Sequence, residues 1–394
     1  MKLRKLTTSL NLKGKQVLIR IDGNVPVVKG RAIDGPHGRI ARVAVDINWL
    51  SHRGAKVIVM THLGRPNGRR ISAYGVKPVA KRLSSLLGMP VVVTRSVIGS
   101  DVGKMVEKMR EGDVVMLENL RFDRREEENA SSFAEALAKI GDLYVNDGFA
   151  VSHRAHASVD AITSCLPSYA GPLLAQEISI LDKLEGQTKK PFVLVLGGLK
   201  MSTKLPIMER FLPRIDTLLV GGALATVFLV AQGKSVGRSV YEPESVQTAV
   251  QLLARHANKI QLPTDVVCVR SARRDAKQAV KSIDEIDAND RIVDIGPLTR
   301  KAFASAITQA KTIVWNGPLG YCEVAAFCAG TREVAGVIAK QTGRATTIVG
   351  GGDTLPVIES LKLADKFTLL STGGGALLEF LAGKALPGIE ALRG

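Results

Sequence analysis

The chain has 394 residues, of which 45% are hydrophobic, and this length predicts two domains. Because it contains no run of about 20 apolar residues, a membrane-spanning helix is not expected. The formal net charge of +17 is spread over both halves and favours anionic ligands, while the low aromatic content of 4% offers few stacking platforms for nucleic acid. We therefore expect small-molecule partners, with neither a membrane nor a nucleic acid among them.

The N-terminal stretch MKLRKLTTSL is basic but lacks the apolar core of a signal peptide, so a soluble cytoplasmic protein is expected. The four cysteines, Cys165, Cys268, Cys322 and Cys328, form no C-x-x-C pair and show no zinc-like spacing to a histidine. We interpret them as buried or free thiols in a reducing compartment.

Short apolar strands alternate with amphipathic helices along the first half. The expected strands are residues 16–22, 55–62, 90–94, 113–119 and 142–147, with helical patterns at 41–54 and 78–88 between them. We place the first domain at residues 1–170. Residues 165–190 contain several prolines and a helical stretch from 172 to 184, which predicts an interdomain helix within 171–186.

The second half repeats this alternation and is taken as a second domain at 187–371. Its expected strands are residues 192–198, 217–222, 259–269, 311–317, 345–352 and 367–375. Nearly continuous apolar strands separated by helices are typical of parallel sheets that are covered on both faces. The fold class predicted is therefore α/β, with two doubly wound, Rossmann-like domains.

The strand ends of the first half are basic. Ligands of open α/β sheets bind beyond the carboxyl ends of the strands. The polar residues expected there are Asp22, Asn24, Arg39, His62, Arg65, Arg121, His153, Arg154 and His156. Arginine suits bidentate binding of phosphate or carboxylate, so the set predicts a pocket for a small, highly anionic molecule. The alternatives are solvated arginines, or a metal site at the three histidines, which no carboxylate or cysteine accompanies at ligand spacing.

The strand ends of the second half are rich in glycine. Six turns such as VLGGLK and VGGGDT follow apolar strands, and together they predict a nucleotide-binding surface. Asp353 fits a Mg²⁺ ion held mainly by phosphates and water, or alternatively the N-cap of the next helix. Glu323 would accept a hydrogen bond from a ribose hydroxyl, or lie on a solvated helix.

Two lysines, Lys200 and Lys204, follow the first of these glycine turns. Read as a helix start, their spacing of four places them on one face, where like charges repel slightly unless a polyphosphate lies between them. The alternative is a pair of surface lysines. An anion site in one half and a nucleotide site in the other together predict phosphoryl transfer, which needs positioning and charge neutralisation above all.

The motifs VLIRIDGNVP, THLGRP, LENLRF, YVNDGFAVSHRAHASV, VLGGLKMSTKL, VWNGPLG, IVGGGDT and STGGGALLEF stand in the order and spacing of phosphoglycerate kinases. The resemblance extends from about Val17 to Leu392. It implies a hinge-bending, monomeric enzyme of glycolysis that transfers a phosphoryl group reversibly between 1,3-bisphosphoglycerate and ADP, giving 3-phosphoglycerate and ATP. It also implies that residues 372–394 return to the first domain.

The resemblance further implies roles for individual residues. Those expected to bind the glycerate substrate are Asp22, Asn24, Arg39, His62, Leu63, Gly64, Arg65, Arg121 and Arg154. Those expected to bind ATP or ADP are Lys204, Gly296, Asn316, Glu323, Gly351, Gly352, Asp353 and Thr354, with Asp353 on Mg²⁺. Arg39, Lys200, Gly352 and Gly375 are expected to act on the phosphoryl group during transfer.

Three departures from the family pattern stand out. Gly23 replaces an aromatic residue, Leu199 is bulkier than the usual alanine, and Thr203 replaces an acidic residue beside Lys204. Since the lysines, the arginines and the GGGDT run are kept, we expect altered kinetics or metal dependence before loss of activity. The alternative is a catalytically silent relative that binds a nucleotide or a nucleic acid.

Overall fold

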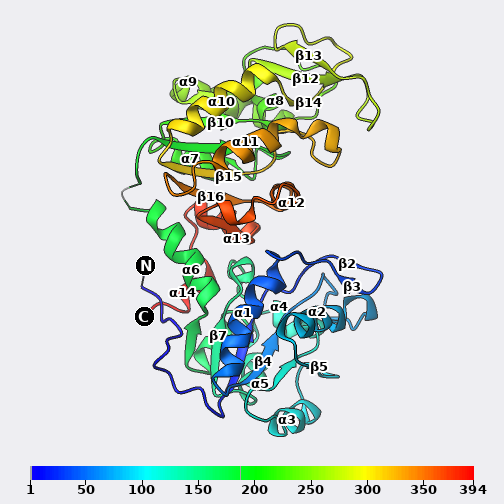
Figure 1. Cartoon of the computed structure of the whole chain (residues 1–394), viewed down its shortest axis with the longest axis vertical. Coiled ribbons are helices and arrows are strands. Elements are labelled where there is room, and N and C mark those ends of the chain that lie inside the picture. Colours follow the sequence, from blue (N-terminus) through cyan, green and yellow to red (C-terminus); the bar gives the residue numbers. More distant parts are fainter. Residues whose placement is uncertain (1, 187) are drawn as a thin grey trace. The chain divides into compact units, whose positions relative to one another are not determined.

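The computed structural model describes residues 2–186 and 188–394, which divide into two compact units (Figure 1). Unit 1 comprises the chain up to residue 182 together with 375–380 and 384–394, and unit 2 comprises 183–374 and 381–383. The domain limits expected at residues 1 and 187 lie outside the described residues. The helical stretch expected at 172–184 is an α-helix at Pro172–Leu181 (α6) followed by a 3-10 turn at Asp182–Leu184.

Unit 1 is built on a six-stranded parallel sheet in the order β5-β6-β4-β1-β7-β8. Its strands are β1 (Gln16–Arg20), β4 (Lys56–Met60), β5 (Val91–Val93), β6 (Val114–Met116), β7 (Leu143–Asn146) and β8 (Ser168–Ala170). Its helices are α1 (Arg39–His52), α2 (Lys77–Leu87), α3 (Ser100–Glu107), α4 (Arg124–Glu127), α5 (Ser131–Ala138), α6, α13 (Gly375–Leu381) and α14 (Pro387–Glu390). A short hairpin joins β2 (Val27–Val28) to β3 (Arg31–Ala32). The five strands expected here are confirmed within one residue at their starts and three at their ends.

Helices cover both faces of this sheet because its strands are apolar on both sides. Val17 and Ile19 of β1 pack in one core with α1 and α2, whereas Leu18 packs in a second core with residues of α3 and α5. α1 buries Ile40, Val43, Ala44, Ile47 and Leu50, which share one helical face.

The end of the chain completes unit 1. Arg4 donates a backbone hydrogen bond to Leu392 at 2.9 Å, and Gly388 donates one to Ser152 at 2.9 Å. The labels N and C accordingly lie close together beside α6 and α14 (Figure 1).

Unit 2 contains a second six-stranded parallel sheet, in the order β11-β10-β9-β15-β16-β17. Its strands are β9 (Phe192–Leu196), β10 (Thr217–Val220), β11 (Ile260–Gln261), β15 (Thr312–Asn316), β16 (Thr346–Gly350) and β17 (Leu369–Ser371). Its helices are α7 (Leu205–Phe211), α8 (Gly222–Ala231), α9 (Val246–His256), α10 (Pro297–Gln309), α11 (Ala329–Ala339) and α12 (Leu355–Ser360). The predicted α/β class with two parallel sheets is therefore confirmed.

One expected strand, 259–269, is wrong as a single element. Residues 260–261 form β11, and the chain then breaks at Pro263 before β12 (Asp265–Val269). β12 belongs to a separate antiparallel sheet, between β13 (Ala279–Ser282) and β14 (Arg291–Ile295). Proline has no N–H group for a strand ladder, which explains the break.

The interpretation of all four cysteines as thiols is also wrong. Cys322 and Cys328 form a disulfide, while Cys165 and Cys268 are free. The turn between β15 and α11 folds back and brings the two Cα atoms to 4.6 Å, within the range that a disulfide spans.

Across residues 2–186 and 188–394, every helix is too short or too polar to cross a membrane.

Candidate active site

The polar residues after β1 form a connected group in unit 1. Arg39, the first residue of α1, forms an ion pair with Asp22 at 2.7 Å and donates a hydrogen bond to the Asn24 carbonyl at 2.9 Å. Asp22 in turn accepts from the Asn24 backbone N–H at 3.0 Å. The Asp22 carboxylate thus fixes the turn after β1 and holds the guanidinium at the start of α1.

The loops after β4 and β6 join this group. The Asn24 side chain accepts from the Gly64 N–H at 2.9 Å, and Arg121 donates to the Gly64 carbonyl at 2.9 Å. Gly64 has φ +64°, and a Cβ there would lie 2.3 Å from the Tyr74 ring, so the position requires glycine. Leu63 contributes its carbonyl, which accepts from Asn119 at 2.7 Å.

Arg121 is the most buried arginine among the predicted substrate ligands, with 2% of its surface exposed. Burial, opposed by the nearby Glu127, lowers its pKa to about 10, so it remains charged at neutral pH. Its Nε lies 3.2 Å from Glu127, but Nη2 is buried with no hydrogen-bond partner among the described residues. A buried guanidinium N–H without a partner is a position where an anionic ligand would bind.

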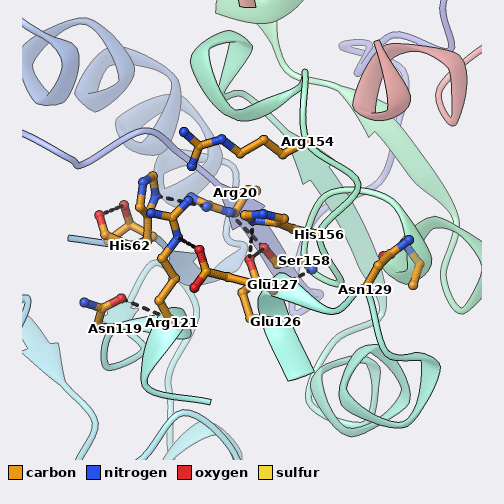
Figure 2. Close-up of polar contacts among 12 residues, drawn as sticks. Arg20, His62, Asn119, Arg121, Glu126, Glu127, Asn129, Arg154, His156 and Ser158 are labelled. Carbon is orange, nitrogen blue, oxygen red and sulfur yellow. Dashed lines mark hydrogen bonds and ion pairs between the residues drawn. The ribbon is translucent and has the colours of Figure 1, made fainter. Parts of the chain in front are cut away.

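His62 lies after β4 and contacts Arg20, which the sequence reasoning missed. Figure 2 shows Arg20 between the His62 ring and the pair Glu126–Ser158. Arg20 Nη2 lies 3.2 Å from His62 Nδ1, and Arg20 Nε donates to Ser158 Oγ at 2.9 Å. Ser158 Oγ donates to Glu126 at 2.6 Å. All three partners behind His62 are fully buried. One feature of the sequence does indicate Arg20: it is the single cationic residue at the end of the apolar strand QVLIR.

The remaining basic residues of this set are less tightly connected. Arg154 donates to His153 Nε2 at 3.2 Å, and burial together with neighbouring cations lowers the pKa of His156 to about 3. Arg65 is exposed and makes no ion pair with the other members among the described residues. The described parts of the chain also contain no group of three or more His, Cys, Asp or Glu side chains arranged to hold a metal ion.

In unit 2, Lys204 points at the end of β15. It is 7% exposed and donates a hydrogen bond to the Asn316 side-chain oxygen. Burial lowers the pKa of Lys204 to about 8, although the Asp353 carboxylate partly opposes this shift. The other polar atom of this amide, Asn316 Nδ2, is buried without a hydrogen-bond partner among the described residues, as is Thr354 Oγ1.

Lys204 lies at the point where the strand order of the sheet reverses, since β10 and β15 flank β9 on opposite sides. Ligands of doubly wound sheets bind at this position. The Gly198 N–H donates to the Pro318 carbonyl at 2.8 Å, which joins the two loops. Gly198, Gly317 and Gly351 have φ values of +92°, +92° and +117°, so these loops need glycine to turn so tightly.

The two lysines do not share a helical face, which corrects the helix-start interpretation. α7 begins at Leu205, and Lys200 lies in the preceding turn, exposed, while Lys204 is buried at the N-cap. Pro206 explains the late start, because proline fits the first turn of a helix but cannot donate the bond that an earlier start needs. Thr203 donates to the Lys200 carbonyl at 2.9 Å and so closes this turn.

A cavity of about 370 Å³ lies beside this loop, wholly within unit 2. Its wall is mainly apolar, with Leu199, Tyr321, Glu323 and Asp353 at its polar or exposed parts. Asp294, another residue that the sequence reasoning missed, also lines it. Burial raises the pKa of Asp294 to about 6, and its carboxylate accepts from the Gly330 N–H at 2.8 Å. A largely apolar cavity with a few polar groups suits a small organic ligand.

Three predicted glycines are not part of the wall of this cavity. Gly296 follows the lining residue Ile295 but packs against Asp265, whose Cγ would lie 2.2 Å from a Cβ at that glycine. Gly352 is exposed with open space around its Cα. Gly375 belongs to unit 1, where a Cβ would lie 3.5 Å from His153 Nε2.

Comparisons with known proteins agree with this architecture. The family model described as phosphoglycerate kinase matches residues 7–384. The phosphoglycerate kinase of Herpetosiphon aurantiacus is 44% identical over 382 residues, covering 96% of each chain, and that of Dictyoglomus turgidum is 43% identical over 386 residues, covering 97% of this chain and 96% of its own.

Solved structures are also similar. The phosphoglycerate kinase of Coxiella burnetii has a TM-score of 0.86 at 39% identity, and that of Pyrococcus horikoshii OT3 has 0.88 at 30% identity. Each match covers 98% of both chains. The chain therefore belongs to the phosphoglycerate kinase family.

Proposed function

We propose that this chain is a phosphotransferase with a carboxyl acceptor, which transfers a phosphoryl group reversibly between 1,3-bisphosphoglycerate and ADP to give 3-phosphoglycerate and ATP. Family membership over nearly the whole chain supports this reaction. The structural observation that supports it is that each unit holds a group of residues suited to an anion. In unit 1 these include the buried Arg121 and His62, and in unit 2 they are the glycine loops around Lys204.

The chemistry of the acceptor fits these residues. The acceptor oxygen of 3-phosphoglycerate belongs to a carboxylate, which is already ionised at neutral pH, so no general base is needed. The site must instead stabilise the negative charge of both substrates and of the phosphoryl group during transfer. Arginine, lysine and backbone N–H groups meet this demand.

We assign the glycerate substrate to unit 1. Arg121 would use its unpartnered Nη2, and Asp22 would accept from a substrate hydroxyl while it orients Arg39. The other proposed ligands are Asn24, His62, Leu63, Gly64, Arg65 and Arg154. Of these, Arg65 and Arg154 are the more exposed and would act by charge at the rim of the site.

We assign the nucleotide to unit 2, with its phosphates over the glycine loops. Lys204, Asn316 Nδ2 and Thr354 Oγ1 would donate to phosphate oxygens, which would satisfy the two buried atoms that lack partners. The base would occupy the apolar cavity and Glu323 would accept from the ribose. Gly296 and Gly351 would shape this surface through their backbone.

Mg²⁺ fits the exposed Asp353 carboxylate at the cavity wall. Since no cluster of three acidic, His or Cys side chains lies near it in the described chain, most of its ligands would be phosphate and water oxygens. When bound, the ion would neutralise charge on the phosphates.

Arg39 and Lys200 would donate hydrogen bonds to the phosphoryl group during transfer, together with the backbone N–H groups of Gly352 and Gly375. We also propose that the protein is monomeric and cytoplasmic, as the family pattern implies.

A coupled assay tests this function. Purified protein with ATP, Mg²⁺ and 3-phosphoglycerate, coupled to glyceraldehyde-phosphate dehydrogenase, should oxidise NADH. Lys200→Ala is the matched control, because Lys200 is exposed and its replacement should leave the fold intact. No signal above this control would refute the proposal, and salt-dependent nucleic-acid binding in its place would favour a catalytically silent relative.

A further inference from the structure

We propose that Arg20 is a positioning residue, which holds His62 as a neutral ring with its proton on Nε2, so that Nε2–H donates to a carboxylate or phosphate oxygen of the substrate. This inference rests on the proposed function, because it takes His62 to be a substrate ligand. It adds a role for a residue that would not itself touch the substrate.

The contact between the two side chains determines the position of the proton. Arg20 Nη2 lies 3.2 Å from His62 Nδ1 (Figure 2). A guanidinium is always a donor and has no acceptor, so Nδ1 must accept through its lone pair. A ring that accepts at Nδ1 carries its single proton on Nε2, and that nitrogen is left to donate.

The surroundings of His62 keep the ring neutral. His62 is 3% exposed, and burial is the main cause that lowers its pKa well below the usual value. Arg20, Arg121, Arg154 and His156 all face it and lower the pKa further by repulsion. The arginines would therefore neutralise the substrate's charge, and His62 would add a directed hydrogen bond without adding a further cation.

The environment of Arg20 shows why it orients a neighbour and does not bind a ligand. Its side chain is fully buried, and it donates from Nε to Ser158 at 2.9 Å and from Nη1 to the Ile21 carbonyl. Ser158 is held by Glu126 through its backbone N–H at 2.9 Å and its hydroxyl at 2.6 Å. The guanidinium is thus fixed from behind, with a buried carboxylate balancing its charge, and only Nη2 reaches forward to His62.

The test removes this donor and measures both tautomer and affinity. Arg20→Met keeps the apolar stem of the side chain and removes the guanidinium, but it leaves the Glu126 carboxylate buried without a countercharge. If this single variant does not fold, the double variant Arg20→Met with Glu126→Gln keeps the buried charge balanced. Tyr144→Phe is the matched control. It removes a hydrogen bond of 2.8 Å to the Ser158 carbonyl in the same buried network without touching His62.

Nitrogen-15 NMR of the histidine rings, assigned with His62→Gln, reports the tautomer directly. In the unmodified protein we expect His62 to show only Nε2–H and not to titrate between pH 5 and pH 8. In the Arg20 variants the ring should stay neutral, because burial is the main cause of its lowered pKa, but its proton should exchange between Nδ1 and Nε2. The KM for 3-phosphoglycerate should rise about tenfold, the effect of one hydrogen bond to a charged group. The KM for ATP should not change.

Three results would overturn the inference. These are Nδ1–H on His62 in the unmodified protein, an unchanged KM and ring signal in the Arg20 variants, and an equal KM rise in Tyr144→Phe, which would reduce Arg20 to a packing role. Failure of the proposed function is distinguishable, because a protein without kinase activity would still report its His62 tautomer by NMR.

Discussion

Binding of ADP or ATP should be coupled to proton uptake by Lys204. Burial lowers the pKa of this ammonium to about 8, and polyphosphate oxygens beside it would restore the charged form. A group with a pKa of about 8 is roughly nine-tenths protonated at pH 7 and roughly one-tenth at pH 9. If the nucleotide binds the charged form, its dissociation constant should rise about tenfold over this range, equivalent to about 1.4 kcal/mol. The terminal phosphate, with a pKa of about 6, has already ionised below pH 7 and does not contribute.

Isothermal titration calorimetry in two buffers of different ionisation enthalpy measures this uptake. We expect about half a proton per ADP at pH 8 and more at pH 9. Lys204→Met should bind more weakly, with no pH dependence between 7 and 9. Lys190→Met is the control, since Lys190 is an exposed lysine of the same unit that pairs with Asp216 at 3.3 Å. A dissociation constant that stays flat from pH 7 to pH 9 in the unmodified protein would show that Lys204 does not contact the phosphates.

Three further predictions follow from other parts of the molecule. Arg39→Ala should lower kcat by about 10²-fold or more, by analogy with losing one transition-state donor, and a rate near that of the unmodified protein would contradict its proposed role. Reduction of Cys322–Cys328 by a dithiol should raise the KM for ATP several-fold, because the loop that it closes carries the cavity residue Glu323, which must then be ordered on binding. The KM for 3-phosphoglycerate should stay constant. In the double Cys→Ser variant, the KM for ATP should be the same with and without the dithiol. Burial and the adjacent Asp46 raise the pKa of Asp147 well above its usual value. The folded state therefore keeps a proton that the unfolded state releases above about pH 4, and this contribution to stability is lost as pH rises through the folded pKa. Asp147→Asn should flatten the fall of Tm with rising pH, and an unchanged profile would refute this assignment.

The parallel strands could be predicted from sequence because their signal is local. Runs such as FVLVL (192–196) are buried on both faces and need no distant partner to be recognised. The antiparallel sheet around β12 was missed because the pattern of residues 259–269 predicts one strand, although Pro263 within them indicates that two strands are present. The late start of α7 had a similar local signal in Pro206.

Buried polar networks could not be predicted in the same way. Arg20 is stable in a core only because Ser158, 138 residues away in sequence, and Glu126 meet it there. The disulfide likewise depends on how the turn between β15 and α11 folds. The roles assigned to site residues stay predictions, although the contacts that join Asp22, Asn24, Gly64 and Arg121 are those expected of one site.

The return of the chain terminus to unit 1 has a consequence for synthesis on the ribosome. Residues 384–394 supply backbone partners to Arg4 and Ser152, whereas unit 2 draws its strands and all but three of its residues from 183–374. A chain made from its N-terminus therefore completes the sheet of unit 2 while unit 1 still lacks its closing segment. The unit that is begun first is the last to be finished, and release of the final residues becomes a step in its maturation.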